Sequence, residues 1–342
     1  MAISNSEIKR AARQVFASSR GYETPFYNRD ISKKEVADHF ANLEPWRGSA
    51  LIISAPMGTG KTFFVDQIKS LLGLTEGKVP LLVGEIEPKT LKKTKGDFVF
   101  VDEGDIKTSW KALHGGLETL GKYLKDTGKI GLVLGDFSLR NPDLSRHLSK
   151  PKFMNSFEPL DEKFLRGVLK QRLSMYLQQK NPPEILSDEL YNVLVPDAYG
   201  PINSFRSVLT FINQLVQELP NNDAACLLTL PMAVDWVKNQ FDPEIDTDRQ
   251  ENFLNFFLDY IAQSHPRGTG LEQGISKEQM YLMGKQVGYT EWPSFQEEIL
   301  IPFGRSGMIL SRGIPRLDEE GQFERWPEPY FPSHVLLLWA ET

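Results

Sequence analysis

The sequence predicts an α/β protein built on a mainly parallel, doubly wound sheet, and three features of its first half support this. An apolar run over 50–54 is followed by a glycine-rich turn and then by a helix over 63–72. A second apolar run, 98–101, ends directly in two carboxylates. A helix over 109–125 then leads into a further apolar strand, 130–135. Strands that alternate with helices through short connections are typical of parallel sheets.

Three further elements belong to this half of the chain. Residues 1–20 predict an amphipathic helix with Ile8, Ala12, Val15 and Phe16 on one face. A shorter helix is expected over 33–43, just before the first strand. The apolar run 80–84 predicts one more strand between the helix 63–72 and the strand 98–101.

The glycine-rich turn after the first strand has the composition of a phosphate-binding loop. Gly58 and Gly60 let the backbone curl, so that successive N–H groups point at a polyphosphate, and the following helix adds its positive end. Lys61 is suited to neutralising the outer phosphates, and the Thr62 hydroxyl to ligating Mg²⁺. A chance glycine-rich turn is the alternative, but the strand before the turn and the helix after it favour the phosphate-binding loop. The expected ATP-binding residues are Pro56, Met57, Gly58, Thr59, Gly60, Lys61, Thr62 and Phe63.

The strand 98–101 runs straight into Asp102 and Glu103. The carboxyl ends of parallel strands lie on one side of a sheet, where ligands of α/β proteins bind. We therefore expect Asp102 to hold Mg²⁺ together with Thr62, and Glu103 to polarise the attacking water. A solvated acidic turn is the alternative for this pair.

Composition excludes several classes of protein. The chain has 342 residues, of which 40% are hydrophobic and 25% charged, as in an ordinary globular protein. Its net charge of −6 means that any contact with nucleic acid must come from local patches. The single cysteine, Cys226, leaves no intramolecular disulfide framework. Without an apolar run of about 20 residues or a signal-peptide pattern, we expect a cytoplasmic protein.

The segment after the strand 130–135 carries a more specific pattern. Asn141-Pro142, Leu144 and Arg146 are followed by an apolar strand and Pro159-Leu160-Asp161. This pattern resembles the end of an AAA+ ATPase core. The resemblance implies that Asp136 senses the γ-phosphate, at a position where the family usually has Asn or Thr. It also implies that Arg146 is the finger that completes a neighbouring subunit's active site. The alternatives are Arg140 in that role, or a surface arginine in an ion pair.

The chain becomes helical from Leu160 to about Gln240 and resembles an AAA+ lid. In that family a helix that begins after a glycine carries a second sensor arginine. The family's position corresponds to Asn203 here, and Arg206 lies one helical turn further on the same face. The resemblance therefore implies Arg206 as the second sensor, with Asn203 or a plain surface role for Arg206 left open.

The last hundred residues predict three helices and a hairpin. Helices are expected around 253–261, over 276–286 and over 294–303, with a hairpin from 308–310 to 330–331. This order resembles a winged helix. The whole chain therefore resembles the Holliday-junction branch-migration ATPase and the origin-initiator ATPases. The expected domains are an AAA+ core with N-terminal helices over 1–158, a helical lid over 159–241 and a winged-helix domain over 242–342.

The resemblance implies a homo-oligomer, a ring or a filament, that hydrolyses ATP at subunit junctions to act on DNA. The lysine-rich stretch 89–95 supports contact with nucleic acid, although such charge runs are often only solvated. Glu297 and Glu298 on the expected recognition helix instead favour a protein partner. An ATP-dependent protein-remodelling switch and a nucleotide-binding scaffold with weak turnover therefore remain alternatives. The candidate nucleic-acid contacts are Lys89, Lys92, Lys93 and Lys95.

Overall fold

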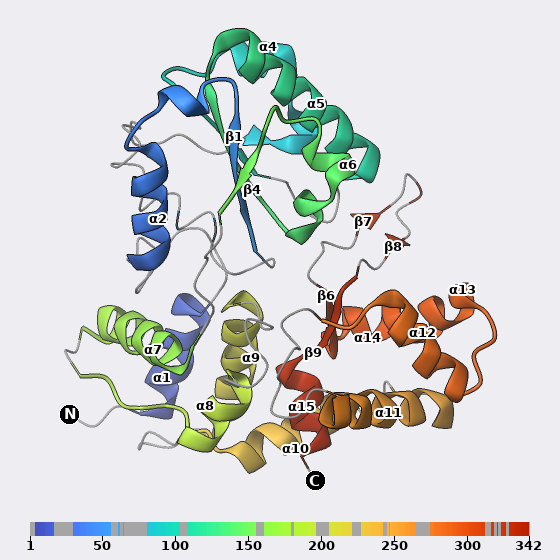
Figure 1. Ribbon diagram of the computed structural model, residues 1–342. Helices are drawn as coiled ribbons and strands as arrows, with labels where there is room; N and C mark the ends of the chain where they lie inside the picture. The colour runs from blue at the N-terminus through green and yellow to red at the C-terminus, as the bar shows by residue number, and fades with distance from the viewer. Residues whose placement is uncertain are drawn as a thin grey trace. The chain divides into compact units, whose positions relative to one another are not determined.

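Figure 1 shows the computed structural model of the chain, which forms two compact units. The first unit comprises Met1–Tyr27, Pro159–Leu310 and Glu328–Thr342, and the second comprises Asn28–Glu158 and Ser311–Pro327. The boundaries of the three expected domains remain a prediction. The structure describes residues 4–16, 30–55, 61, 64, 81–102, 108–154, 161–178, 181–195, 205–220, 227–241, 245, 247–264, 274–311, 316–317, 320, 323–325 and 328–341.

The second unit contains the predicted parallel α/β sheet. Its strands lie in the order β2-β3-β4-β1-β5, and all neighbouring pairs are parallel. This order is typical of an AAA+ core, so the fold class expected from the sequence is confirmed. The strands are β1 (Ala50–Ser54), β2 (Leu81–Leu82), β3 (Phe98–Asp102), β4 (Ile130–Gly135) and β5 (Lys152–Phe153).

Helices cover both faces of this sheet (Figure 1). Side chains alternate between the faces along each strand. Ile52 therefore packs with α5 (Trp110–Thr127), whereas Ile53 packs with α2 (Asp30–Phe40) and the residues that follow it. The central strands β1, β3 and β4 are buried on both faces, which explains their continuous apolar sequences.

Two glycines let α5 approach its neighbours closely. A Cβ atom on Gly116 would lie 2.0 Å from the Val83 carbonyl oxygen, and one on Gly121 would lie 1.8 Å from the His147 carbonyl oxygen. No side chain fits at either distance, so the close packing of α5 against these segments requires glycine at positions 116 and 121.

The segment between β2 and β3 differs from the sequence-based expectation. The predicted strand 80–84 is reduced to β2, because the chain turns into the 3-10 helix η2 (Val83–Glu85). The first part of the lysine-rich stretch 89–95 is helical, and this helix was not predicted. It forms α4 (Pro88–Lys92), which begins with a proline in its first turn and a reciprocal capping interaction between Glu87 and Thr90.

The first unit contains α1 (Asn5–Val15), and Ile8, Ala12 and Phe16 of the predicted apolar face are buried. This helix packs against α7 (Glu162–Leu177) and α9 (Phe205–Glu218). The Asn5 amide donates to the Pro220 carbonyl at 2.8 Å, and Arg13 Nε donates to Gln217 Oε1 at 2.6 Å. The N-terminal helix is thus part of the helical unit. The remaining helices of this bundle are α8 (Asp188–Leu194) and α10 (Leu230–Phe241).

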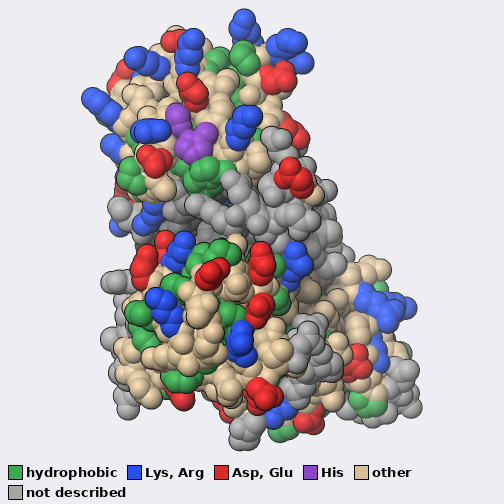
Figure 2. Space-filling view, turned by 90° about the vertical axis from the view of Figure 1, so that its right-hand side faces the viewer, with side chains coloured by type: hydrophobic (Ala, Val, Ile, Leu, Met, Phe, Trp, Pro, Cys, Tyr) green, Lys and Arg blue, Asp and Glu red, His purple; other side chains and the backbone are tan. Residues whose placement is uncertain are grey.

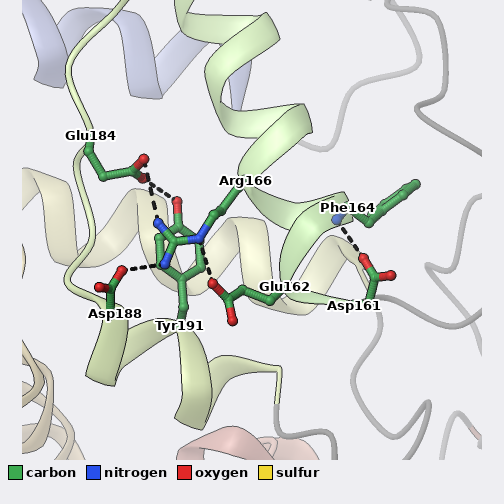
Figure 3. A network of polar contacts seen from close by, with 7 residues as sticks. All are labelled: Asp161, Glu162, Phe164, Arg166, Glu184, Asp188 and Tyr191. Atoms are coloured by element: carbon green, nitrogen blue, oxygen red, sulfur yellow. Dashed lines mark hydrogen bonds and ion pairs between the residues drawn. The ribbon is translucent and has the colours of Figure 1, made fainter.

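A polar network around Arg166 joins α7 to α8 (Figure 3). Its guanidinium bonds Glu162 at 2.6 Å, ion-pairs with Glu184 at 3.6 Å and bonds Asp188, and it lies 3.8 Å from the centre of the Tyr191 ring. Burial lowers the pKa of Arg166, but the hydrogen bonds to Glu162 and Asp188 outweigh this and raise it. The network therefore holds a permanent cation between the two helices.

The C-terminal helices are α11 (Asp248–Ser264), α12 (Lys277–Gln286) and a longer helical run made of α13 (Trp292–Phe295), η8 (Gln296–Leu300) and α14 (Ile301–Arg305). The π-helical segment η8 precedes Pro302, which has no N–H to donate to the Glu298 carbonyl. The buried Gln250 side chain donates to that carbonyl instead, at 2.9 Å. The predicted helix 294–303 is therefore present but irregular.

The expected hairpin is present in two parts. β6 (Ile309–Ser311) pairs with β9 (Tyr330–Pro332), and β7 (Arg316–Leu317) pairs antiparallel with β8 (Phe323–Arg325). A final helix, α15 (His334–Ala340), was not predicted. Its His334 is buried against Phe211, and burial lowers its pKa to about 3.

No helix among the described residues is long and apolar enough to cross a membrane.

The close approach at Gly121 gives a matched pair of substitutions on one helix. We expect Gly121→Ala to lower the free energy of unfolding by roughly 3 kcal/mol, because a backbone carbonyl cannot move away cheaply. A Cβ atom at position 115 of the same helix would have no neighbour within 4 Å. Gly115→Ala should therefore raise the free energy of unfolding by about 0.5–1 kcal/mol. Urea denaturation of both variants measures the difference. Equal stabilities would contradict the packing described for α5.

Candidate functional site

The candidate site lies at the carboxyl edge of the sheet, where β1 ends. Lys61 is helical, and its Nζ donates to the Ala55 carbonyl at 2.7 Å. Phe64, one turn further, is fully buried in the core cluster that contains Leu51 and Phe100. The strand predicted before the phosphate loop is therefore present, and Lys61 and Phe64 are helical, whereas the turn itself lies outside the described residues.

Strand register brings the predicted acidic residues to the same edge. Ser54, the last residue of β1, pairs with Gly135, and the Ala55 N–H bonds the Gly135 carbonyl at 3.0 Å. Asp102, the last residue of β3, pairs with Leu134. Asp136 follows β4 directly, so the ends of β1, β3 and β4 place Lys61, Asp102 and Asp136 along one edge.

The two carboxylates have different surroundings. Asp102 is partly exposed, whereas Asp136 has an exposed fraction of 0%. A partly exposed carboxylate on this edge is suited to a hydrated cation, and a buried one to a fixed hydrogen bond. Asp102 therefore fits the role of cation ligand better than Asp136 does.

Arg140 braces the end of β1, an interaction that the sequence did not reveal. It ends the 3-10 helix η3 (Phe137–Arg140), and its Nε donates to the Ser54 hydroxyl at 2.8 Å. A second nitrogen lies 3.5 Å from the Met154 carbonyl. The one signal in the sequence was Ser54 itself, a polar residue that ends an otherwise apolar strand. Arg140 thus interacts with its own chain at the carboxyl end of β1.

Arg146, unlike Arg140, lies on the surface. It caps the short helix α6 (Pro142–Ser145), and its side chain is 67% exposed. Its only ion pair within the described residues is with Asp143, at 3.5 Å on the same turn, and exposed pairs of this kind contribute little to stability. The guanidinium is therefore accessible to another molecule.

A histidine pair lies beside Arg146. His114 Nδ1 and His147 Nε2 are 3.1 Å apart, and the two rings meet edge to face. Burial and the neighbouring His147 and Arg146 lower the pKa of His114, despite the opposing effect of Asp143. The lowered pKa favours the neutral form of His114, and one ring nitrogen of the pair can then donate to the other. The sequence offered no signal for it, because the two residues come from different elements.

Several predicted site residues lie outside the described part of the chain. These are Pro56, Met57, Gly58, Thr59, Gly60, Thr62, Phe63, Glu103 and Asn203. Arg206 lies in the first turn of α9, but its side chain is not among those described. Their expected roles remain predictions. Among the described residues, no group of three or more His, Cys, Asp or Glu is arranged to hold a metal ion.

The candidate nucleic-acid contacts lie on or just after α4. Lys89, Lys92, Lys93 and Lys95 are all exposed. Lys93 and Lys95 follow α4 and precede β3, which places them toward the amino edge of the sheet. Lys93 and Lys95 therefore lie toward the edge of the sheet opposite Lys61.

Comparison with known proteins gives a likeness of fold. No protein-family model matches the sequence, and no curated protein matches it. A RuvB variant of Thermotoga maritima is 16% identical with a TM-score of 0.44, over 84% of this chain and 91% of that one. A chain from Drosophila ORC bound to DNA is 12% identical with a TM-score of 0.41, over 89% and 85%. Cdc6p from Pyrobaculum aerophilum is 12% identical with a TM-score of 0.40, over 86% and 90%. The chain is thus structurally similar to these AAA+ proteins, at low identity, over most of its length.

Proposed function

We propose that this protein is an oligomeric ATPase that binds Mg²⁺-ATP at the carboxyl edge of its parallel sheet and acts on DNA. The observation that carries the proposal is the position of Lys61, Asp102 and Asp136, which follow or end three adjacent strands at that edge. A cation, a partly exposed carboxylate and a buried carboxylate at one edge suit a metal-bound polyphosphate.

Each residue has an expected role. The backbone from Pro56 to Gly60 cradles the phosphates, and Lys61 neutralises the outer ones. Thr62 and Asp102 hold Mg²⁺, and Glu103 accepts a proton from the attacking water. Asp136 orients that water or the terminal phosphate. Arg206, or Asn203 in its place, contacts the phosphates from the lid.

We propose that Arg146 acts on the nucleotide of a neighbouring subunit. Its exposure and its weak pairing within the chain support a role in another molecule's site. Arg140, the alternative, is bonded to Ser54 of its own chain and suits a role in cis. A guanidinium supplied by a neighbour would stabilise charge that builds up on the transferred phosphoryl group.

A protein partner is the second candidate function, and the first unit supplies the observation that favours it. Phe256 on α11 is 43% exposed and Leu282 on α12 is 60% exposed. Glu297 and Glu298 are exposed on the helix expected to read DNA. Apolar and acidic surface residues are more typical of a protein interface than of a surface that contacts phosphates.

Lys61→Ala should abolish ATP binding. Wild-type protein with ATP at a hundred times its Kd should gain about 2.7 kcal/mol of stability, and the variant should gain none. Thermal unfolding with and without Mg²⁺-ATP measures this. Lys163→Ala removes an exposed lysine from α7 and serves as the control. An unchanged ATP-dependent shift in Lys61→Ala would rule out the phosphate loop.

Glu103→Gln should retain ATP binding and lose turnover. Replacing the carboxylate by an amide removes the base and keeps its size, so steady-state hydrolysis should fall by at least ~10²-fold. Measured binding and hydrolysis together separate this effect from loss of the site. Wild-type turnover would assign the base to another residue.

Arg146→Ala should bind ATP almost normally and hydrolyse it poorly. Mixing it with Lys61→Ala should restore part of the activity, because some junctions then combine an intact loop with an intact finger. Rates across a mixing series test this, with co-assembly checked by light scattering. Lack of any rescue in co-assembled mixtures would contradict a role in trans. Full activity of Arg146→Ala alone would remove the residue from the site.

A further inference from the structure

The amino edge of the same sheet is strongly basic. The residues that lead into β1, β3 and β4 are 41–49, 93–97 and 125–129, and residues 149–152 lead into β5 and include its first residue. Because the strands are parallel, these four segments lie at one edge, opposite the candidate ATP site. Their basic residues are Arg47, Lys93, Lys95, Lys125, Lys129, Lys150 and Lys152, and their acidic residues are Glu44, Asp97 and Asp126.

Hydrogen bonds join the four segments into one surface. The Gly48 N–H bonds the Lys129 carbonyl at 3.1 Å, and the Ile130 N–H bonds the Asp97 carbonyl at 2.8 Å. The Ser49 hydroxyl donates to the Lys150 carbonyl at 3.0 Å. The basic side chains are therefore carried by a rigid backbone.

Two of the three acidic residues are already engaged with one arginine. Arg47 pairs with Asp97 at 2.9 Å and with Glu44 at 3.5 Å. Of the lysines, Lys129 donates to the Thr94 carbonyl at 2.7 Å and serves the fold, and Lys152 Nζ lies 4.3 Å from the centre of the Trp46 ring. Because basic residues outnumber acidic ones, the exposed lysines of this edge give it an excess of positive charge. The exposed lysines of the amino edge are Lys93, Lys95, Lys125, Lys150 and Lys152.

Lys150 has a backbone conformation that favours glycine. Its φ angle is +48°, in the left-handed region, and its side chain is exposed. A lysine at such a position costs stability relative to glycine, and an exposed side chain gains little from packing to offset this cost. Residues held in unfavourable conformations are concentrated at functional sites. Neither the backbone conformation nor packing therefore accounts for a lysine at position 150.

The surface lacks the features of a protein or membrane interface. The exposed large hydrophobic side chains among the described residues all belong to the first unit: Met175, Leu227, Met232, Phe256 and Leu282. Figure 2 shows many Lys and Arg side chains, with Asp and Glu side chains among them, over the end of the second unit that carries α4 in Figure 1. A partner for this edge must therefore be bound by charge without apolar burial.

We propose that the amino edge of the sheet, defined by Lys93, Lys95, Lys125, Lys150 and Lys152, binds the phosphodiester backbone of a nucleic acid. Phosphates repeat along that backbone and need only point charges for recognition, which lysine supplies. Binding is independent of base sequence, because lysines at this edge contact phosphates rather than base edges. The surface is separate from the ATP site, and the proposal does not depend on hydrolysis.

The test is binding of nucleotide-free protein to labelled duplex DNA over a range of salt concentrations. The variant combines Lys125→Gln, Lys150→Gly and Lys152→Gln. The control combines Lys163→Gln, Lys170→Gln and Lys285→Gln, which removes the same charge from exposed sites of the first unit. Removal of one lysine–phosphate interaction should reduce the slope of log K against log salt by about 1. The slope should therefore fall by up to ~3 in the triple variant and stay close to that of the wild type in the control.

Separate probes distinguish the sources of negative charge. Duplex RNA should also bind, whereas phosphatidylserine vesicles and polyglutamate should bind more weakly than DNA at the same salt. Equal salt slopes for the triple variant and the control would overturn the proposal, and so would preferential binding of vesicles or polyglutamate. Loss of ATP hydrolysis with intact DNA binding would affect only the proposed ATPase function.

Lys150→Gly alone separates binding from folding. Glycine relieves the left-handed conformation, so its melting temperature should equal or exceed that of the wild type, while its affinity for DNA falls. Because the melting temperature of the variant is not lowered, misfolding cannot explain its weaker binding to DNA. Wild-type affinity in this variant would remove Lys150 from the surface.

Discussion

Parallel pairing of β1 with β4 is the constraint on which both proposed surfaces depend. The register runs from Ala50 opposite Gly131 to Ser54 opposite Gly135, and β3 continues it on the other side of β4. Every chain segment that leaves these strands therefore emerges at one edge, and every segment that enters them lies at the other. Lys61, Asp102 and Asp136 share the first edge for this reason. The lysines before β3, β4 and β5 share the second.

Packing around α5 keeps this arrangement rigid. Gly116 and Gly121 allow backbone atoms of neighbouring segments to contact the helix, and a Cβ on Gly131 would lie 2.8 Å from the Leu124 side chain. The contact at Gly121 also holds the backbone of His147, next to Arg146. The position of the proposed finger thus depends on a close contact between α5 and the turn after α6, as well as on its own helix.

The features that could be predicted are those that depend on residues close together in the sequence. The strand β1 and the carboxylate that ends β3 are predicted from consecutive residues, and the alternation of strands and helices predicts the sheet. The helix α4 was missed although its proline and its capping pair were present in the sequence. The helix α15 was missed because a short apolar run such as His334–Ala340 does not distinguish a helix from a strand.

Long-range contacts explain what could not be predicted. Periodicity shows that α1 has an apolar face, but not that this face packs against α7 and α9. The bond from Arg140 to Ser54, the histidine pair and the network around Arg166 each join residues from separate elements. Such pairings depend on the folded arrangement of the elements, which one sequence without related sequences does not reveal.

Binding of Mg²⁺-ATP between subunits, at the carboxyl edge of the sheet, is the central claim. Electron cryomicroscopy of the protein with Mg²⁺ and a non-hydrolysable ATP analogue tests it most directly, with and without duplex DNA. We expect an assembly in which the analogue lies beside Lys61 and Asp102 and faces Arg146 of the adjacent subunit. Monomers without nucleotide at that edge, at concentrations of analogue that saturate other ATPases, would contradict it.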